Sequence, residues 1–304
     1  MKKVWSILIL FILSLVFLTA CGEDDSTSSV SASDSSDNAK KENDDWPETI
    51  RFAVTGIEGL EELQRQYGAF QDLMERLLDV EVEFFALSNR TIAATAMEYD
   101  QVDIILSGPS EYAQTKSAEP GAEPLAAIER AAYYTVFIVA EDSEFQTLED
   151  LKGHSIAMKE AGSTSGHIGP SALLIENGID IHRDVDIKLL DGARVDALKS
   201  GEVDALADGI RVYDKLVEED GEGVWRILVE GPPLPQDPFV ASPKLPESFK
   251  AEFKRVLLEH EEEFLEAILS HEENEKYREA KIVDIDDSDY DLMRETYKTL
   301  GIDL

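Results

Sequence analysis

The sequence predicts an α/β protein with two lobes, each a mostly parallel sheet flanked by helices. Short apolar runs alternate with helical patterns through the first half of the chain, which is typical of parallel sheets with right-handed crossovers. A second alternating series begins near His154. The roughly 255 residues beyond the N-terminal region are also many for one hydrophobic core, so we expect two lobes.

The first series is regular. The β-branched run Thr49–Val54 predicts a strand, and the apolar face of Glu58–Leu78 predicts an amphipathic helix. Three further elements are expected in the order strand, helix, strand: Val80–Ala86, Thr91–Tyr99 and Val102–Leu106.

A long apolar strand, Tyr133–Ala140, precedes the second series, and Thr147 to Asp150 looks like a capped helix start. Further strands are expected at His154–Met158, Asp186–Leu190, Val203–Ala207 and Trp225–Val229. Helices are expected at Thr164–Glu176, closed by Asn177-Gly178, and near Ala193–Ser200. Two series of this kind indicate two lobes.

The proline-rich segment Gly231–Pro238, with Phe239–Ala241, is interpreted as a return crossing between the lobes. Only helices are expected from Pro246 to the end, packed against the first lobe. The first lobe then comprises residues 48–138 and 241–304, and the second comprises 139–240. Two hinge crossings, near Ala140 and Asp237, join them.

The N-terminus has the features of an export signal. Lys2 and Lys3 precede an apolar run from Val4 to Leu18, and small residues lead to Cys21. This arrangement resembles the bacterial lipobox, which predicts removal of residues 1–20 and a lipid anchor on Cys21 at the extracytoplasmic face of the cell membrane. The polar stretch through residue 47 is expected to be a disordered tether. An uncleaved single-pass anchor is the alternative.

The charge is strongly acidic: 64 Asp and Glu residues face 28 Lys and Arg residues, for a formal net charge of −36. Nucleic acid and anionic lipid would be repelled, so neither is expected as a partner. A solvated acidic surface suited to salty or alkaline surroundings would explain the same charge, which therefore says little about a small ligand.

The segment Gly162-Ser163-Thr164-Ser165-Gly166-His167 lies between a predicted strand and a predicted helix. Consecutive hydroxyls beside glycines, at a helix start with free backbone N–H groups, can hold a tetrahedral oxyanion. An ordinary helix cap with a glycine-rich turn would have the same sequence.

Several stretches resemble the substrate-binding proteins of phosphonate, phosphite and phosphate ABC importers, which have the two-lobed type II periplasmic-binding-protein fold. The resemblance covers residues 49–304, and the Ser163–Gly166 and Pro235–Pro238 segments are its most diagnostic parts. Val82–Ala96, Val102–Ile104, Gly108-Pro109, Tyr133–Val139, Leu148–Gly153, Pro170 and Val203–Ala205 also carry it.

This resemblance implies that Ser163, Thr164 and Ser165 hold a phosphonate, phosphite or phosphate ligand and that Tyr133 contacts it. A family tyrosine falls on Asn89 here, with Arg90 beside it to compensate. The implied protein is a monomer that works with a permease and an ATPase, does no covalent chemistry, and uses no cofactor or metal.

The sequence also departs from the family. Phosphonate binders carry a Gly-His-Glu element whose Glu can meet a ligand amino group, but Asp191–Val195 stands there and is two residues shorter. Aminoalkyl phosphonates are therefore disfavoured. Arg194 adds charge-assisted bonds to a phosphoryl group if it faces the cleft; a helix-surface position is the alternative.

Three weaker candidates follow. Ser107 ends a strand where parallel sheets bind ligands, although a plain turn is equally consistent. His167 is either a donor to the ligand or a surface residue. Asp208 either orients Arg194 or Arg211, or caps the following helix.

Three other functions fit parts of the pattern. An enzyme would use Ser163 or Ser165 with His167 as base, but the G-x-S-x-G element of hydrolases is absent. A ferric-iron protein would use Tyr133, Tyr134 and His167, although adjacent strand residues point to opposite faces. A sensor that is not part of a transporter would share the fold.

Overall fold

The computed structural model describes residues 45–304. The predicted signal peptide, Cys21 and most of the predicted tether lie outside this range. Within it, no helix combines the length and the apolar character that crossing a membrane requires.

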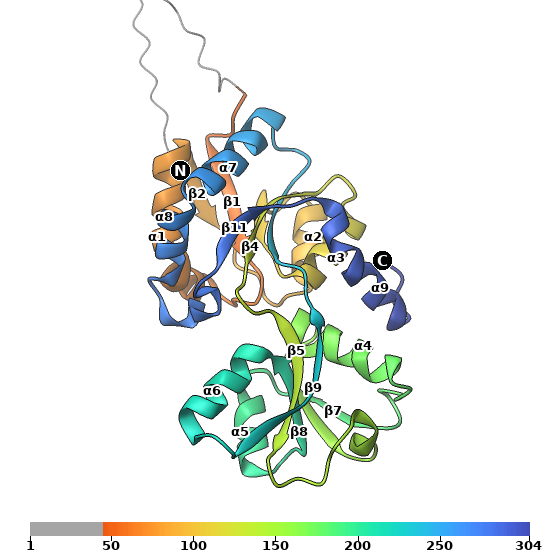
Figure 1. The fold of residues 1–304 in the computed structure, drawn as a ribbon. Coiled ribbons are helices and arrows are strands. Elements are labelled where there is room, and N and C mark those ends of the chain that lie inside the picture. The colour runs from red at the N-terminus through yellow and green to blue at the C-terminus, as the bar shows by residue number, and fades with distance from the viewer. Residues whose placement is uncertain (1–44) are drawn as a thin grey trace, which may run out of the picture. The chain divides into compact units, whose positions relative to one another are not determined.

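Two sheets organise the described residues (Figure 1). The first sheet, in lobe I, has the strand order β11-β4-β10-β3-β1-β2. Its strands are β1 (Thr49–Val54), β2 (Glu81–Phe84), β3 (Ile104–Leu106), β4 (Glu123–Glu129), β10 (Asp237–Ala241) and β11 (Lys281–Asp284). The second sheet, in lobe II, has the order β7-β6-β8-β5-β9. Its strands are β5 (Tyr134–Ala140), β6 (Ser155–Met158), β7 (Asp186–Leu189), β8 (Ala205–Gly209) and β9 (Trp225–Pro233).

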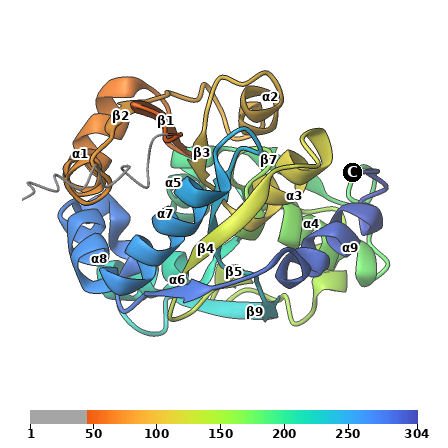
Figure 2. The same cartoon turned by 90° about the horizontal axis from the view of Figure 1, so that it is seen from above.

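Helices cover both faces of the first sheet. One face buries Phe52, Phe70 and Phe253 under α1, α7 and α8, while the other buries Ala53 and Tyr112 under α2 and α3. Because side chains alternate along β1, its neighbouring residues reach opposite layers. Figure 2 shows the two groups of helices on either side of the strands. The helices are α1 (Leu60–Leu78), α2 (Ile92–Glu98), α3 (Pro109–Ala118), α7 (Glu247–Glu259), α8 (Glu261–Leu269) and α9 (Asp291–Thr299), with the short turns η4 (Glu272–Tyr277) and η5 (Asp287–Tyr290).

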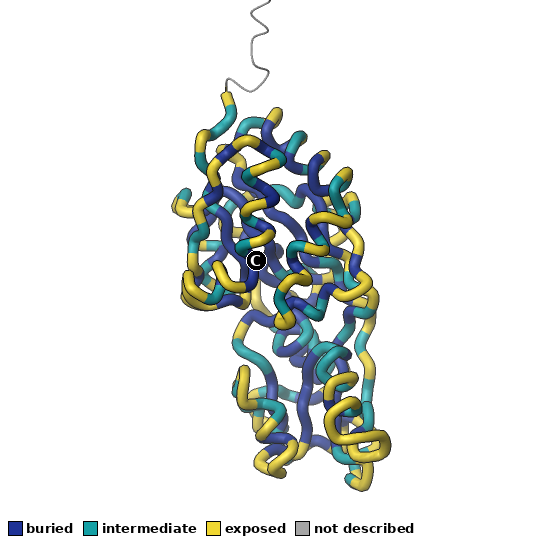
Figure 3. The backbone as a smooth tube through the Cα atoms, turned by 90° about the vertical axis from the view of Figure 1, so that its left-hand side faces the viewer, coloured by how far each residue is buried: buried dark blue, intermediate teal, exposed yellow. Residues whose placement is uncertain are grey.

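Lobe II has the same layered plan, and Figure 3 shows its strands buried between more exposed helices. Phe137 and Met158 lie in one core layer and Val136 and Leu206 in the other. Its helical elements are η1 (Leu148–Leu151), η2 (Thr164–Ile168), α4 (Gly169–Glu176), η3 (Asp191–Ala193), α5 (Arg194–Ser200) and α6 (Ile210–Asp220). Thr147 and Asp150 form the capping box that the sequence predicts.

The predicted α/β fold with two sheets is confirmed, but the sheets are mixed rather than mostly parallel. β1 pairs in parallel with β2 and β3, and β6 pairs in parallel with β7 and β8. β10 and β4 pair antiparallel in lobe I, and β5 pairs antiparallel with β8 and β9 in lobe II. The sequence prediction missed this because β5 and β10 enter their sheets from the other lobe.

The C-terminal region also differs from the prediction of helices alone. Lys281–Asp284 forms β11 and pairs antiparallel with β4 at the sheet edge. The predicted packing of α7 and α8 on lobe I is confirmed, since their side chains join the core beside α1. The last helix, α9, contacts α3 of lobe I and α4 of lobe II.

Two connections join the lobes, at residues 130–133 and 234–236. They lie side by side, because Leu234 N donates to Tyr133 O at 2.9 Å and Arg130 N donates to Gln236 Oε1 at 2.9 Å. The predicted limits at 138/139 and 240/241 thus fall inside β5 and β10 rather than in the connections.

Trp46, which the sequence assigns to the tether, packs on the folded part. Its ring meets Phe249 edge-on with centroids 5.2 Å apart, and its Nε1 donates to Ser248 Oγ at 3.2 Å. Trp46 is apolar enough to bury on α7, so the ordered region begins before residue 47.

Candidate functional site

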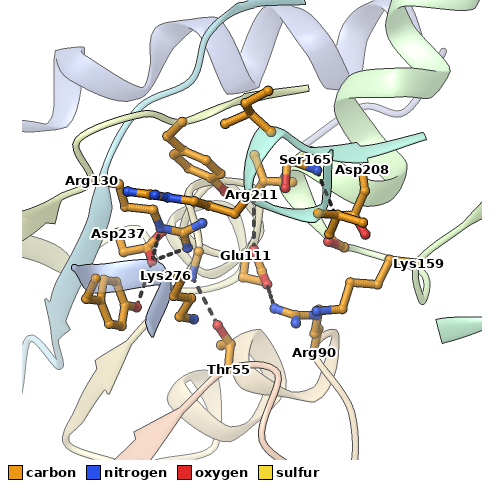
Figure 4. Close-up of a pocket in the computed structure, with 18 of the residues that line it drawn as sticks. Thr55, Arg90, Glu111, Arg130, Lys159, Ser165, Asp208, Arg211, Asp237 and Lys276 are labelled. Carbon is orange, nitrogen blue, oxygen red and sulfur yellow. Dashed lines mark hydrogen bonds and ion pairs between the residues drawn. The ribbon is translucent and has the colours of Figure 1, made fainter. Parts of the chain in front are cut away.

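A cavity of about 160 Å³ lies where the two lobes meet (Figure 4). Strands β1, β3, β6 and β8 all end at it, through Thr55, Ser107, Lys159 and Asp208. Ligands of α/β proteins commonly bind at the carboxyl ends of parallel strands, because the loops that follow can present polar groups there. The position alone therefore favours a small-ligand site.

The predicted oxyanion segment lines this cavity. Ser163, Thr164 and Ser165 are all lining residues, and Ser163 and Thr164 are buried. Thr164 begins η2, a single π-helical turn that continues into α4. A helix leaves its first N–H groups without intrahelical acceptors, so this segment presents donors as well as hydroxyls.

Two glycines allow this geometry. Gly162 has a backbone φ of +91°, which residues other than glycine rarely adopt. A Cβ on Gly166 would lie 2.6 Å from Lys159 Cβ, so only glycine lets the segment approach the end of β6 this closely. Lys159 N also donates to Gly166 O at 2.9 Å. The glycines therefore fix the hydroxyl segment beside Lys159.

The hydroxyl segment also contacts lobe I directly. Ser110, on α3, donates from Oγ to Gly162 O at 2.6 Å and lies 2.8 Å from Thr164 Oγ1. The backbone N of Ser110 donates to Thr164 Oγ1 at 3.1 Å. The Thr164 hydroxyl is therefore engaged across the cleft, and the two lobes are closed on each other.

The cavity is rich in cations although the whole chain is acidic. Among the residues that the structure describes, six basic side chains line it and three acidic ones do. The basic residues are Arg90, Arg130, Lys159, Arg194, Arg211 and Lys276, and the acidic residues are Glu111, Asp208 and Asp237. Low-dielectric walls around such a surplus concentrate a positive potential, so the cavity favours anions.

Three of these cations are held by close ion pairs. Arg90 pairs with Glu111 at 2.9 Å and with Glu160 of lobe II, so it too bridges the lobes. Arg130 pairs with Asp237 and lies over the Tyr133 ring, 3.9 Å from its centroid. These pairs hold the guanidinium groups in place.

The third of these cations, Arg194, pairs with Asp208, and this ion pair fixes the start of α5. Arg194 also donates to Asp191 O at 2.6 Å. The sequence offered either a cleft-facing Arg194 or one on the helix surface, and the structure places it in the cavity. Asp208 accepts from Arg194 and from Gly209 N at 2.7 Å, so it orients Arg194.

Lys159 and Lys276 make no ion pair within 4.0 Å among residues 45–304. Burial lowers the pKa of Lys159, and the charge of Arg90 lowers it further. Burial lowers the pKa of Lys276 to about 7, with repulsion from Arg130 and attraction from Asp237 acting on the same ammonium group. A bound anion would stabilise both ammonium groups.

The other predicted site residues divide into two sets. Tyr133 and Ser107 line the cavity, and burial raises the pKa of the Tyr133 hydroxyl, which stays a neutral donor. Asn89 and His167 do not line it.

The structure gives both side chains other contacts. The Asn89 side chain accepts from Ile92 N at 3.1 Å and so caps α2, which leaves Arg90 as the residue of this loop that reaches the cavity. His167 Nδ1 accepts from Gly162 N at 3.2 Å, so this nitrogen is engaged with the backbone, and burial lowers the pKa of the ring.

Five charged residues of the cavity were not predicted from the sequence: Arg130, Lys159, Lys276, Glu111 and Asp237. They come from five separate segments, so no local spacing marks them. The Asp of Pro235–Pro238 was noted only as part of a family motif. Its function here is to hold Arg130 and to accept from Tyr277 Oη at 2.7 Å.

Tyr133 and Tyr134 are not arranged as two ligands of one iron ion. Within residues 45–304, no group of three or more His, Cys, Asp or Glu side chains is placed to hold a metal ion. Tyr133 faces the cavity, whereas Tyr134 packs against the core of lobe II, as expected for neighbours on a strand. The two phenols therefore do not converge on one ion.

Comparisons with known proteins identify the family of this chain. A family model described as the periplasmic substrate-binding protein of a phosphonate ABC transporter matches residues 52–290. The chain is 26% identical over 216 residues to the phosphonates-binding periplasmic protein of Escherichia coli, covering 66% of this chain and 63% of that protein. It is 28% identical over 140 residues to a phosphate-import protein of Mycolicibacterium smegmatis, covering 44% of each. The chain thus spans less than two thirds of the length of these curated relatives.

A solved structure shows the same fold. The Prochlorococcus marinus protein PhnD1, solved in complex with methylphosphonate, has a TM-score of 0.68 at 19% identity, covering 84% of this chain and 98% of that chain. The family match covers most of the chain and includes the strands and loops that build the cavity. This chain therefore belongs to the family of periplasmic substrate-binding proteins of phosphonate ABC transporters.

Proposed function

We propose that this protein captures a phosphorus oxyanion, of the phosphonate, phosphite or phosphate type, and delivers it to the permease and ATPase of an ABC importer. The observation that carries the proposal is the cavity: a hydroxyl-bearing helix start and a surplus of cations meet inside a chain of net charge −36. A phosphoryl group needs both hydrogen-bond donors and compensation of its negative charge.

Each group has a definite task in this proposal. The hydroxyls of Ser163 and Ser165 and the N–H group of Ser165 hold the phosphoryl oxygens, while Lys159 supplies charge from the end of β6. Thr164 closes the lobes through Ser110. Tyr133 donates its hydroxyl, and Arg130 keeps its ring in place.

Delivery requires the lobes to open and close. We assign the hinge to the paired connections at residues 130–133 and 234–236, and therefore assign residues 46–129 and 237–304 to lobe I. Only two short segments need to change φ and ψ for such a motion. A lipid on Cys21 would keep the protein beside its permease on the outer side of the membrane.

No covalent chemistry is proposed. His167 is not placed as a base for Ser163 or Ser165, because it does not line the cavity and its Nδ1 is engaged with Gly162 N. The site binds and releases its ligand unchanged.

Isothermal titration with methylphosphonate, phosphite, phosphate and 2-aminoethylphosphonate tests the proposal. We expect one-to-one binding of at least one of the first three, lost or weakened at least tenfold in Ser165→Ala, since a hydrogen bond to a charged group contributes about 1.5–3 kcal/mol. Ser117→Ala, at an exposed position of α3, is the matched control. If none of the four ligands binds, the proposal that this protein captures a phosphorus oxyanion is refuted.

A further inference from the structure

A second, outer pocket of about 520 Å³ adjoins the oxyanion cavity. Residues of α6 line one side of it, and residues of η4 and the turn that follows line the other. Ser163, Thr164 and Ser165 line only the inner cavity, whereas three cations line both spaces: Arg194, Arg211 and Lys276. We call these three residues the junction cations.

The junction cations differ in how their charges are engaged. Arg194 is engaged by Asp208 and by Asp191 O. Arg211 is not: its Nε is buried without a hydrogen-bond partner among the described residues, and its ion pair with Asp214 is long, at 3.9 Å. An unpartnered buried donor of a charged group is costly, so Arg211 is suited to an anionic acceptor.

Lys276 is similarly available. It makes no ion pair with a carboxylate of the described residues, and its ammonium group lies 4.7 Å from the centroid of the Tyr277 ring. Figure 4 shows Lys276 and Arg211 among the residues that line the inner cavity. Among the described residues, Arg211 and Lys276 are therefore the junction cations that no close carboxylate engages.

The size of the inner cavity makes this arrangement relevant to the ligand. A cavity of about 150 Å³ holds a molecule the size of benzene. A phosphoryl group with a one- or two-carbon substituent therefore matches the 160 Å³ space, which the hydroxyl segment and the junction cations both line. A substituent that points toward Arg211 and Lys276 would meet positive charge, so an ammonium group there would be repelled.

We propose that the preferred ligand carries a second anionic group, a carboxylate or a second phosphoryl group, which Arg211 and Lys276 bind at the junction. This inference rests on the proposed function, because it extends the same site. Arg211 and Lys276 then select among the ligands, and the hydroxyl segment binds the phosphoryl group that all candidate ligands share.

The test is isothermal titration of the purified protein with methylphosphonate, phosphonoacetate, pyrophosphate and 2-aminoethylphosphonate. We expect phosphonoacetate, pyrophosphate or both to bind at least about tenfold more tightly than methylphosphonate, since one charge-assisted hydrogen bond contributes that factor or more. The first two ligands distinguish a carboxylate from a second phosphoryl group. We expect 2-aminoethylphosphonate to bind most weakly.

Variants assign the effect to residues. Lys276→Met and Arg211→Gln should each reduce the preference for the doubly anionic ligand about tenfold, whereas Lys215→Met, at an exposed position of the outer pocket, should leave it unchanged. Unchanged melting temperatures identify the folded variants, and either variant alone is sufficient for the test. This inference alone is overturned if methylphosphonate binds as tightly as both doubly anionic ligands. It is also overturned if the folded variants keep the preference for the doubly anionic ligand. Binding of none of the ligands overturns the proposed function as well.

Discussion

Ser110 closes the cleft, and its removal should weaken ligand binding without unfolding either lobe. The Ser110 side chain is fully buried and makes two hydrogen bonds across the cleft, to Gly162 O at 2.6 Å and to Thr164 Oγ1 at 2.8 Å. In an open form the same groups bond to water. Ser110→Ala therefore changes the free energy of the closed form far more than that of the open form.

The magnitude follows from these two bonds. Each contributes about 0.5–1.5 kcal/mol, so the closed form loses about 1–3 kcal/mol relative to the open form. Because the ligand is enclosed only when the lobes are closed, Kd should rise about 5- to 150-fold, mostly through faster dissociation.

The assay is titration of Ser110→Ala with the tightest phosphorus ligand, together with stopped-flow measurement of its release. Ser117→Ala removes the same atom from an exposed position on the same helix and should leave Kd unchanged. A change in Kd of less than twofold in folded Ser110→Ala would show that this contact does not close the cleft.

Three further predictions concern protonation, selectivity and the folded boundary. The lowered pKa of Lys276, about 7, means that this side chain is neutral in most molecules at pH 8; an anion beside it raises the pKa again, so binding at that pH should take up protons. Titration calorimetry in buffers of different ionisation enthalpy should show this uptake in the wild type and less of it in Lys276→Met, and equal uptake in both would contradict it. Arg194→Met frees Asp208 and should raise the affinity for 2-aminoethylphosphonate relative to methylphosphonate at least about tenfold, measured by competition titration; an unchanged ratio would show that the freed Asp208 carboxylate does not reach the ligand's amino group. Trp46→Ala removes an edge-on aromatic contact and should lower Tm by about 2–6 °C in calorimetry. An unchanged Tm would show that Trp46 does not stabilise the folded part.

The elements whose side chains follow a local period could be predicted from sequence. Thr49–Val54 is a strand at the predicted residues, and the predicted helix at Glu58–Leu78 begins two residues later, at Leu60. Strand direction was less accessible, because it depends on which lobe the chain has just left. β11 was missed because only Ile282 of its four residues is buried, so the strand has no apolar run.

The site divides in the same way. Ser163, Thr164 and Ser165 are consecutive, so the sequence alone could indicate an oxyanion holder. Arg130 and Lys276 lie far apart in the sequence and meet only because the two connections and η4 converge on the cavity. Asn89 was carried over from a family position, but its side chain caps α2. A cation cluster assembled from separate segments has no spacing that a single sequence reveals.

A crystal structure of the protein with methylphosphonate tests the central claim most directly. We predict that the phosphorus atom lies inside the 160 Å³ cavity and that its oxygens lie within hydrogen-bond distance of the Ser163–Ser165 segment. Lys159 should lie on the same side of the ligand, and the methyl group should point toward Arg211 and Lys276. An empty cavity at saturating ligand, or a phosphoryl group bound away from the start of η2, would contradict it.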